Sequence, residues 1–259
     1  MHKIFFVSLL IIISISINSC SPKLAPAARF QQSAIVADGN TNDWSMPLPF
    51  TNDHYTYHYN ITNDDKNIYI VIISKDYLTQ IRMLRSGITV YFDPTGEKNK
   101  NISLFFPLRK PDDPSTHYKN ENQLSSADQK NEMNQLLLQS DYYGTAGFIN
   151  MENGQFNIKN ENHTVQVALK LNDSLLVYEA IIPLRNLVEE LNEKEYKKNF
   201  SICVALNNVP NQPDESFAPS HSNYNGIHLS GTNTRIGGPK KNTETKEEDS
   251  WYQFHLVNK

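Results

Sequence analysis

The sequence has no excess of basic residues, only one long apolar run, no internal repeat and no second-domain boundary. Its 24 Lys and Arg are outnumbered by 28 Asp and Glu, which excludes the basic footprint typical of proteins that bind nucleic acid. The apolar run, residues 4–17, is shorter than the about 20 residues that a transmembrane helix needs. We therefore expect one domain, and 259 residues are ample for one hydrophobic core.

The first twenty residues have the three parts of an export signal. Lys3 supplies a positive end, and residues 4–17 form an apolar core of the usual length for a signal. Ile17-Asn18-Ser19-Cys20 follows, and a cysteine directly after a small residue resembles the bacterial lipobox, although Ile17 stands where Leu is usual. This resemblance implies that residues 1–19 are removed and that Cys20 is lipid-modified and anchors the protein in a lipid bilayer. A plain secreted protein with a chance cysteine is the alternative.

Residues 20–32 are expected to be the lipidated cysteine and a flexible tether, because residues 21–28 are rich in Pro and Ala. A lipobox cysteine carries three acyl chains, and two or more chains anchor a protein stably. Ser21 follows the cysteine where Asp would signal retention, which by the known sorting rule favours the outer membrane of the cell envelope. A periplasm-facing position is slightly preferred over the cell surface. Cys203 is then left without a disulfide partner, and its apolar surroundings predict a buried thiol.

Short apolar or alternating runs, separated by Asn, Asp, Gly and Pro, dominate the remaining sequence and predict an all-β protein. Residues 55–61 alternate strictly and residues 68–73 are apolar throughout, which predicts a hairpin whose second strand is buried on both faces. Asp93-Pro94-Thr95-Gly96 predicts a tight turn. Further strands are expected at residues 34–37, 87–92, 102–106, 147–149, 156–158, 165–171, 175–182, 200–206 and 251–257.

Two connecting helices are expected, at residues 126–139 with Ser126 as N-cap and at residues 185–196. Residues 111–123 and 207–250 are polar and predicted to be loops. Many short strands without a βαβ rhythm favour a sandwich of two sheets.

Residues 36–44 (VADGNTNDW) resemble the "[IV]-x-D-G-x-x-x-D-W" opening of the family 9 carbohydrate-binding modules and their DOMON-like relatives. Three further stretches fit the family in the same order: residues 63–72 with an aspartate just beyond, residues 90–94, and residues 177–184 (VYEAIIPL). The resemblance implies one immunoglobulin-like or jelly-roll-like β-sandwich over residues 33–259, with one or two short helices in connections. We expect Trp44 to plug one end of this sandwich.

Candidate ligand-binding residues are aromatic, because sugars stack on exposed aromatic faces. Tyr55, Tyr57 and Tyr59 share one face of a predicted strand, and Tyr142 and Tyr143 lie together in a predicted loop. The alternative is that the strand tyrosines simply line a sheet face. Both tryptophans, in the opening motif and at the start of the last strand, are assigned to the scaffold.

A weak metal signal comes from Asp38, Asn40, Asn42 and Asp43, which offer oxygens at nearly alternate positions as in a calcium loop. The residues that an EF-hand needs at its sixth and twelfth positions are missing, so only an ordinary loop calcium remains open. His54 and His58 would lie about 13 Å apart on a strand, too far for one zinc ion. No cofactor is otherwise expected, and no catalytic motif was found.

The expected function is that of a membrane-anchored, non-catalytic, carbohydrate-binding-like lipoprotein of the bacterial envelope, with a glycan as its partner. The alternative is a structural or assembly lipoprotein that uses the sandwich for protein–protein contacts. A hydrolase of unrecognised type is a third reading. An exposed aromatic pair beside a concave face would favour the first function, and a flat apolar patch would favour the second.

Overall fold

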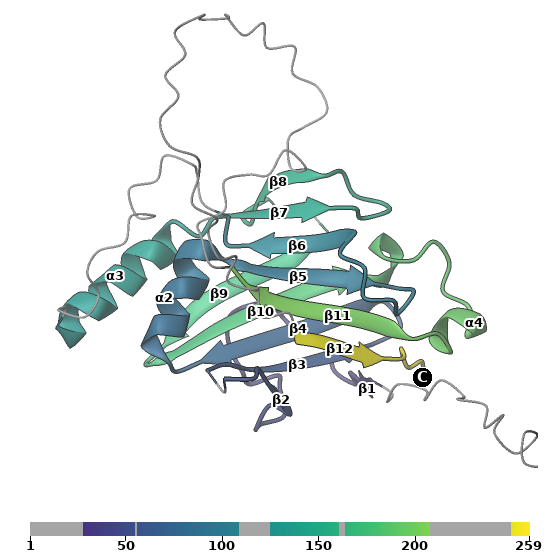
Figure 1. Ribbon diagram of the computed structural model, residues 1–259, viewed down its shortest axis with the longest axis horizontal. Coiled ribbons are helices and arrows are strands. Elements are labelled where there is room, and N and C mark those ends of the chain that lie inside the picture. The colour runs from purple at the N-terminus through teal and green to yellow at the C-terminus, as the bar shows by residue number, and fades with distance from the viewer. Residues whose placement is uncertain (1–27, 55, 109–124, 161–163, 208–249) are drawn as a thin grey trace, which may run out of the picture.

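A computed structural model describes residues 28–54, 56–108, 125–160, 164–207 and 250–259. It contains two six-stranded sheets that form two layers, with short helices at the ends of the strands (Figure 1). The predicted signal (1–19), Cys20, the tether up to residue 27, the predicted loop 111–123 and most of the predicted loop 207–250 lie outside the described residues.

The first sheet, named here the β4 sheet, has the order β1-β3-β4-β10-β9, and β2 pairs with β3. Its strands are antiparallel except for β1, which runs parallel to β3. The bounds are β1 (Arg29–Phe30), β2 (Phe50–Thr51), β3 (His58–Asn63), β4 (Asn67–Ser74), β9 (Gln166–Asn172) and β10 (Leu175–Pro183).

The second sheet, named here the β11 sheet, is antiparallel throughout and has the order β12-β11-β5-β6-β7-β8. The bounds are β5 (Ile88–Asp93), β6 (Ile102–Phe106), β7 (Tyr142–Ala146), β8 (Gly154–Asn157), β11 (Phe200–Leu206) and β12 (Ser250–Phe254).

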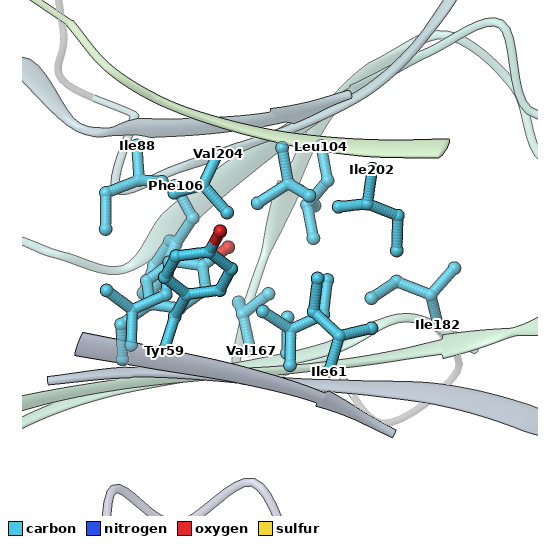
Figure 2. Close-up of a cluster of buried hydrophobic side chains, with 14 of the residues drawn as sticks. Tyr59, Ile61, Ile88, Leu104, Phe106, Val167, Ile182, Ile202 and Val204 are labelled. Atoms are coloured by element: carbon cyan, nitrogen blue, oxygen red, sulfur yellow. The ribbon is translucent and has the colours of Figure 1, made fainter. Parts of the chain in front are cut away.

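The main hydrophobic core lies between the two sheets. Alternate residues of each strand point into it, because successive strand side chains point to opposite faces. Figure 2 shows Ile61 and Ile182 of the β4 sheet facing Leu104 and Ile202 of the β11 sheet, and all four are at most 2 % exposed. Full burial of each such side chain contributes about 1.5–3 kcal/mol. The expectation of an all-β, two-sheet fold is confirmed.

A second, smaller core covers the outer face of the β4 sheet. Tyr69, Val71 and Ile73 of β4 point away from the main core and pack against residues of the segment 35–48. The prediction that residues 68–73 are buried on both faces is therefore confirmed. Trp44 belongs to this outer core, so the expectation that it plugs an end of the sandwich is wrong: it covers a face instead.

The helices are α2 (Tyr77–Ser86), α3 (Ser126–Leu138), the 3₁₀ helix η3 (Leu184–Asn186) and α4 (Glu193–Tyr196). Helix α3 confirms the expected helix, but its N-cap is Ser125, whose Oγ accepts from the Asp128 amide. The predicted helix 185–196 forms only as the two short pieces η3 and α4. Helix α2 was not predicted. No helix in the described part of the chain is both long enough and apolar enough to span a bilayer.

Two strand predictions were wrong. Residues 34–37 form no strand, and they lie on the outer face of the β4 sheet without joining its ladder. Strand β7 covers residues 142–146, where a loop was expected, and residues 147–149 form a turn where a strand was expected. Gly147 ends β7 with a φ of +75°, and a Cβ there would lie only 2.0 Å from the carbonyl oxygen of Asn101.

Candidate functional site

Tyr57, Tyr59 and Tyr143 are buried, with exposed fractions of 3 %, 5 % and 1 %. Tyr57 and Tyr59 lie on the inner face of the β4 sheet with Ile61, where the Tyr59 ring is seen between the layers (Figure 2). Burial raises the pKa of Tyr59 to about 12 and raises that of Tyr143 as well. The prediction that these three side chains form an exposed platform is therefore wrong. The alternative, that the strand tyrosines line a sheet face, is confirmed.

Tyr142 and Tyr143 do not form a pair either. They are consecutive residues of β7, so their rings point to opposite faces of the β11 sheet. Tyr143 packs into the core 5.5 Å from the ring centroid of Phe156, whereas Tyr142 is half-buried. Tyr55 lies outside the described residues.

The predicted calcium loop is held by hydrogen bonds of its own. The Asp38 carboxylate accepts from the backbone and side-chain amides of Asn40, each at 2.8 Å. These bonds lower the pKa of Asp38 below its usual value. The side-chain oxygen of Asn40 faces Lys170 Nζ at 3.5 Å, Asp43 accepts from the Val36 amide, and Asn42 is exposed. Within the described ranges no group of three or more His, Cys, Asp or Glu residues could hold a metal ion.

A buried carboxylate lies beneath this loop. Glu179 of β10 is 0 % exposed, and its Oε2 accepts from the amides of Asp38 at 3.0 Å and Gly39 at 2.7 Å. Its Oε1 accepts from Trp44 Nε1 at 2.7 Å. Burial raises the pKa of Glu179, while the hydrogen bonds from Trp44 and Gly39 oppose that rise. Glu179 therefore joins the segment 35–48 to the outer face of the β4 sheet.

Gly39 explains why the loop can approach β10 and β9 so closely. It has a φ of +74°, and a Cβ at this position would lie 2.3 Å from the Cβ of Lys170. The aspartate, glycine and tryptophan of the opening motif and the glutamate of the late motif thus meet at one place. Sequence reasoning identified both motifs but not the contact between them.

The same segment forms one wall of a pocket of about 360 Å³ at the end of the β3–β4 hairpin next to α2. Met46, Pro47 and Leu48 form this wall. Ile73 and Leu175, from β4 and β10, lie on the outer face of the sheet and form the floor. A volume of this size lies at the small end of the range for ligand pockets, about 300–1,000 Å³.

Four polar residues line the pocket: Thr56, His58, Lys75 and Asp76. His58 pairs with Ile73 in the ladder, and Lys75 follows Ser74, the last residue of β4. Both side chains line the pocket.

These polar residues differ in what they already bind. Asp76 caps α2, and its Oδ2 accepts from the Thr79 amide at 2.8 Å. The Thr56 hydroxyl accepts from Asn52 Nδ2 at 3.2 Å. His58 and Lys75 are exposed, and in the described structure neither side chain makes a hydrogen bond or ion pair. The pocket therefore combines an aliphatic floor with two unpartnered nitrogen-bearing side chains.

The predicted hairpin could have placed His58 beside Ile73, but no sequence signal brings residues 46–48 over them. The pocket arises from the packing of a segment without regular structure on the outer face of the sheet.

A second surface feature lies on the outer face of the β11 sheet. Cys203 pairs with Trp251 on one side and Tyr91 on the other, so the two aromatic side chains flank it. Both aromatics are half-buried, whereas Cys203 is fully buried, as predicted. Lys100 Nζ lies 4.8 Å from the centroid of the Tyr91 ring, a cation–π distance.

No protein-family model matches the chain, and no match among curated proteins was found.

Proposed function

We propose that the chain is a membrane-anchored, non-catalytic binding lipoprotein of the bacterial envelope, built on a carbohydrate-binding-like β-sandwich of immunoglobulin-like or jelly-roll-like type. The anchor is Cys20, and the ligand is held in the pocket at the end of the β3–β4 hairpin. The pocket is the observation that carries this proposal, because its described lining comes from four separate parts of the chain and its rim keeps two side chains without partners.

The position of the pocket suits a tethered binding protein. The last residues of the predicted tether (20–32) belong to the fold: Ala28 is buried in the main core, and β1 pairs with Thr62 and Asn63 at one end of the β3–β4 hairpin. The pocket lies at the other end, beyond Ile73. The 8 residues of β4 separate the two ends by about 25 Å. A lipid at Cys20 would thus hold the molecule by one end and leave the pocket at the other.

The Glu179 contact supports the resemblance to the family 9 modules and their DOMON-like relatives. Two of the four stretches that carry the resemblance bind each other through this carboxylate. One buried glutamate, which accepts hydrogen bonds from the glycine and the tryptophan of the opening motif, accounts for both motifs. Two motifs joined by one contact support the resemblance more strongly than either motif alone.

Glycan binding at the β11 sheet is the second candidate, and the pair Tyr91 and Trp251 favours it. Both rings are partly exposed on one face of the sheet, where a pyranose ring could stack on Trp251, while Lys100 Nζ already lies over the Tyr91 ring. The aliphatic pocket is a poorer place for a sugar, since no Phe, Tyr or Trp ring among the described residues lines it.

The lead proposal is tested with the chain from Ser21 to Lys259, which contains every described residue. A library of sugars, aliphatic acids and alcohols is screened for compounds that raise its melting temperature. Hits are repeated with Met46→Trp, which places a bulky ring at the pocket wall; Met46 is 52 % exposed, so the fold should tolerate the change. Hits that stabilise the wild type and not the variant support the pocket. Equal stabilisation of both proteins, or no hit, overturns it.

The glycan candidate has its own test. The wild type and Trp251→Ala are applied to the same array of plant, microbial and host glycans. Binding that the substitution abolishes supports stacking on Trp251. An array on which the wild type binds nothing refutes the candidate and leaves the pocket proposal untouched.

Membrane anchoring is tested in cells with an alkyne-labelled fatty acid. We expect label on the wild-type protein and its recovery in the membrane fraction, because three acyl chains hold a protein stably. The Cys20→Ala variant should lose the label and leave the membrane fraction. Label retained on Cys20→Ala would contradict the assignment.

A further inference from the structure

The rim of the pocket indicates what kind of ligand fits, an inference that rests on the proposed function. Lys75 offers an ammonium group, and His58 offers a ring N–H donor. Neither has a hydrogen-bond or ion-pair partner in the described structure, and both line the same pocket. One small anionic group placed between them could contact both.

The other polar residues of the pocket already have hydrogen-bond partners. Among the described residues Asp76 is the one acidic group in the lining; its Oδ2 accepts from the Thr79 amide, and its negative charge lies at the N-terminus of α2, where the helix dipole favours it. Thr56 is likewise engaged with Asn52. The described polar groups of the lining that have no partner are therefore a cation and a donor, Lys75 and His58.

The apolar side chains of the pocket favour a ligand whose uncharged part is a hydrocarbon. Leu48, Ile73 and Leu175 are aliphatic, and Met46 and Pro47 continue the apolar wall toward solvent. An unbranched hydrocarbon chain would bury its surface here, whereas hydroxyl groups of a sugar would be left without partners against this floor.

We propose that the pocket binds a small aliphatic carboxylate, with its hydrocarbon chain on Ile73 and Leu175 and its carboxylate at Lys75 and His58. The unpartnered Lys75 and His58 at the rim and a volume suited to a small molecule argue for this occupant over a protein surface. A protein–protein interface of standard size buries about 1,600 Å² in total, far more than such a pocket offers.

Calorimetric titrations of the Ser21–Lys259 chain with hexanoate, octanoate, 1-octanol and octylamine test the proposal. Octanoate should bind about fourfold to twentyfold more tightly than hexanoate, because each buried methylene contributes about fourfold. It should also bind about fivefold more tightly than 1-octanol, as expected for one exposed ion pair. Octylamine should bind most weakly.

Two matched charge variants locate the carboxylate. Lys75→Gln should lower the affinity for octanoate about fivefold and leave the affinity for 1-octanol unchanged. Lys66→Gln makes the same charge change in the β3–β4 turn, at the opposite end of the hairpin, and should change neither affinity. Met46→Asp, at an exposed position of the wall, should weaken octanoate more than 1-octanol because it adds a negative charge.

Failure of this inference differs from failure of the proposed function. Equal affinity for octanoate and 1-octanol, or no effect of Lys75→Gln, would overturn the claim that the rim binds a carboxylate. The pocket would then remain a binding site for apolar ligands. Tighter binding of a short peptide with a C-terminal leucine would overturn it in favour of a protein partner. No binding of any of these probes would overturn this inference, while the proposed function would fall only if the wider library also gave no hit.

Discussion

At the scale of single residues, Glu179 shows how one buried charge can organise a segment without regular structure. It accepts hydrogen bonds from Gly39 and Trp44, and through them holds residues 35–48 against the β4 sheet. A buried carboxylate is costly unless its oxygens are satisfied, and here both oxygens accept. The glutamate thus supports the pocket without lining it.

The substitution Glu179→Gln should lower the free energy of unfolding by about 2–3 kcal/mol. A glutamine amide nitrogen cannot accept a hydrogen bond, so it would face either the Trp44 Nε1–H or the backbone amides of Asp38 and Gly39 as donor against donor. Urea denaturation measures the change. Glu190→Gln is the matched control, because Glu190 is exposed and its replacement should cost less than about 0.5 kcal/mol. Equal small losses in both variants would contradict the role given to Glu179.

At the scale of elements, the hairpin β5–β6 turns where the sequence predicts. Asp93 accepts from the amide and hydroxyl of Thr95 at 2.9 and 2.7 Å and from the Asn99 amide at 2.8 Å. Gly96 closes the turn with a φ of +76°, donating to the Asp93 carbonyl oxygen. Turn chemistry is local, which is why four consecutive residues suffice to predict it.

Asp93 should make stability fall in acid. Burial alone would raise the pKa of its carboxyl, but the hydrogen bonds from Thr95 and Asn99 outweigh burial and lower it. A lowered folded-state pKa means that the unfolded chain binds the proton more readily, so this stabilisation is complete above the ordinary value of about 3.8 and is lost as pH falls through the folded-state pKa.

The variant Asp93→Asn should therefore be less stable than the wild type at pH 7 by about 1–2 kcal/mol. The difference should shrink as pH falls below about 4, because the wild type then loses the charge that the variant lacks. Thermal unfolding of both proteins between pH 2.5 and 7 measures it. A difference that stays constant over this range would contradict the role of the charge.

Helix α2 shows the limit of prediction at this scale. Asp76 caps the helix, but β-type runs precede and follow it, and its buried residues include polar ones such as Thr79 and Gln80. Gln80 donates to the carbonyl oxygens of Ser74 and Ser174, at the ends of β4 and β10. The helix is thus fixed by contacts with two strands that lie far apart in the sequence, which local periodicity does not reveal.

At the scale of the whole molecule, β4 and β10 form the centre of the structure. They are paired with each other and with a further strand on either side, and both of their faces are covered. Strand β8, by contrast, is the last strand of the β11 sheet and is only partly buried. Local stability should differ accordingly.

Hydrogen exchange followed by mass spectrometry should show this gradient. Amides of Asn67–Ser74 and Leu175–Pro183 should exchange only through global unfolding, so their protection should follow the free energy of unfolding when urea is added. Amides of Gly154–Asn157 should exchange through local opening and depend little on urea. Faster exchange in β4 than in β8 would contradict the central position of β4.

The sequence by itself determined those features that depend on neighbours along the chain. These are the all-β class, the alternation that puts Tyr57, Tyr59 and Ile61 on one face, and the turn at Asp93. Residues a few positions apart decide them, since turn geometry and the two-residue period of a strand are local. The same alternation could not tell whether the tyrosine face is exposed or buried.

Only the tertiary structure decided which faces are covered and what meets there. It buried Tyr59 by placing the β11 sheet over it, joined Glu179 to Trp44 across 135 positions of sequence, and laid Met46 beside His58 to form the pocket. These contacts depend on how whole layers pack. The burial of apolar surface that drives such packing has no direction along the chain, so a strand pattern records that a face is apolar but not what covers it.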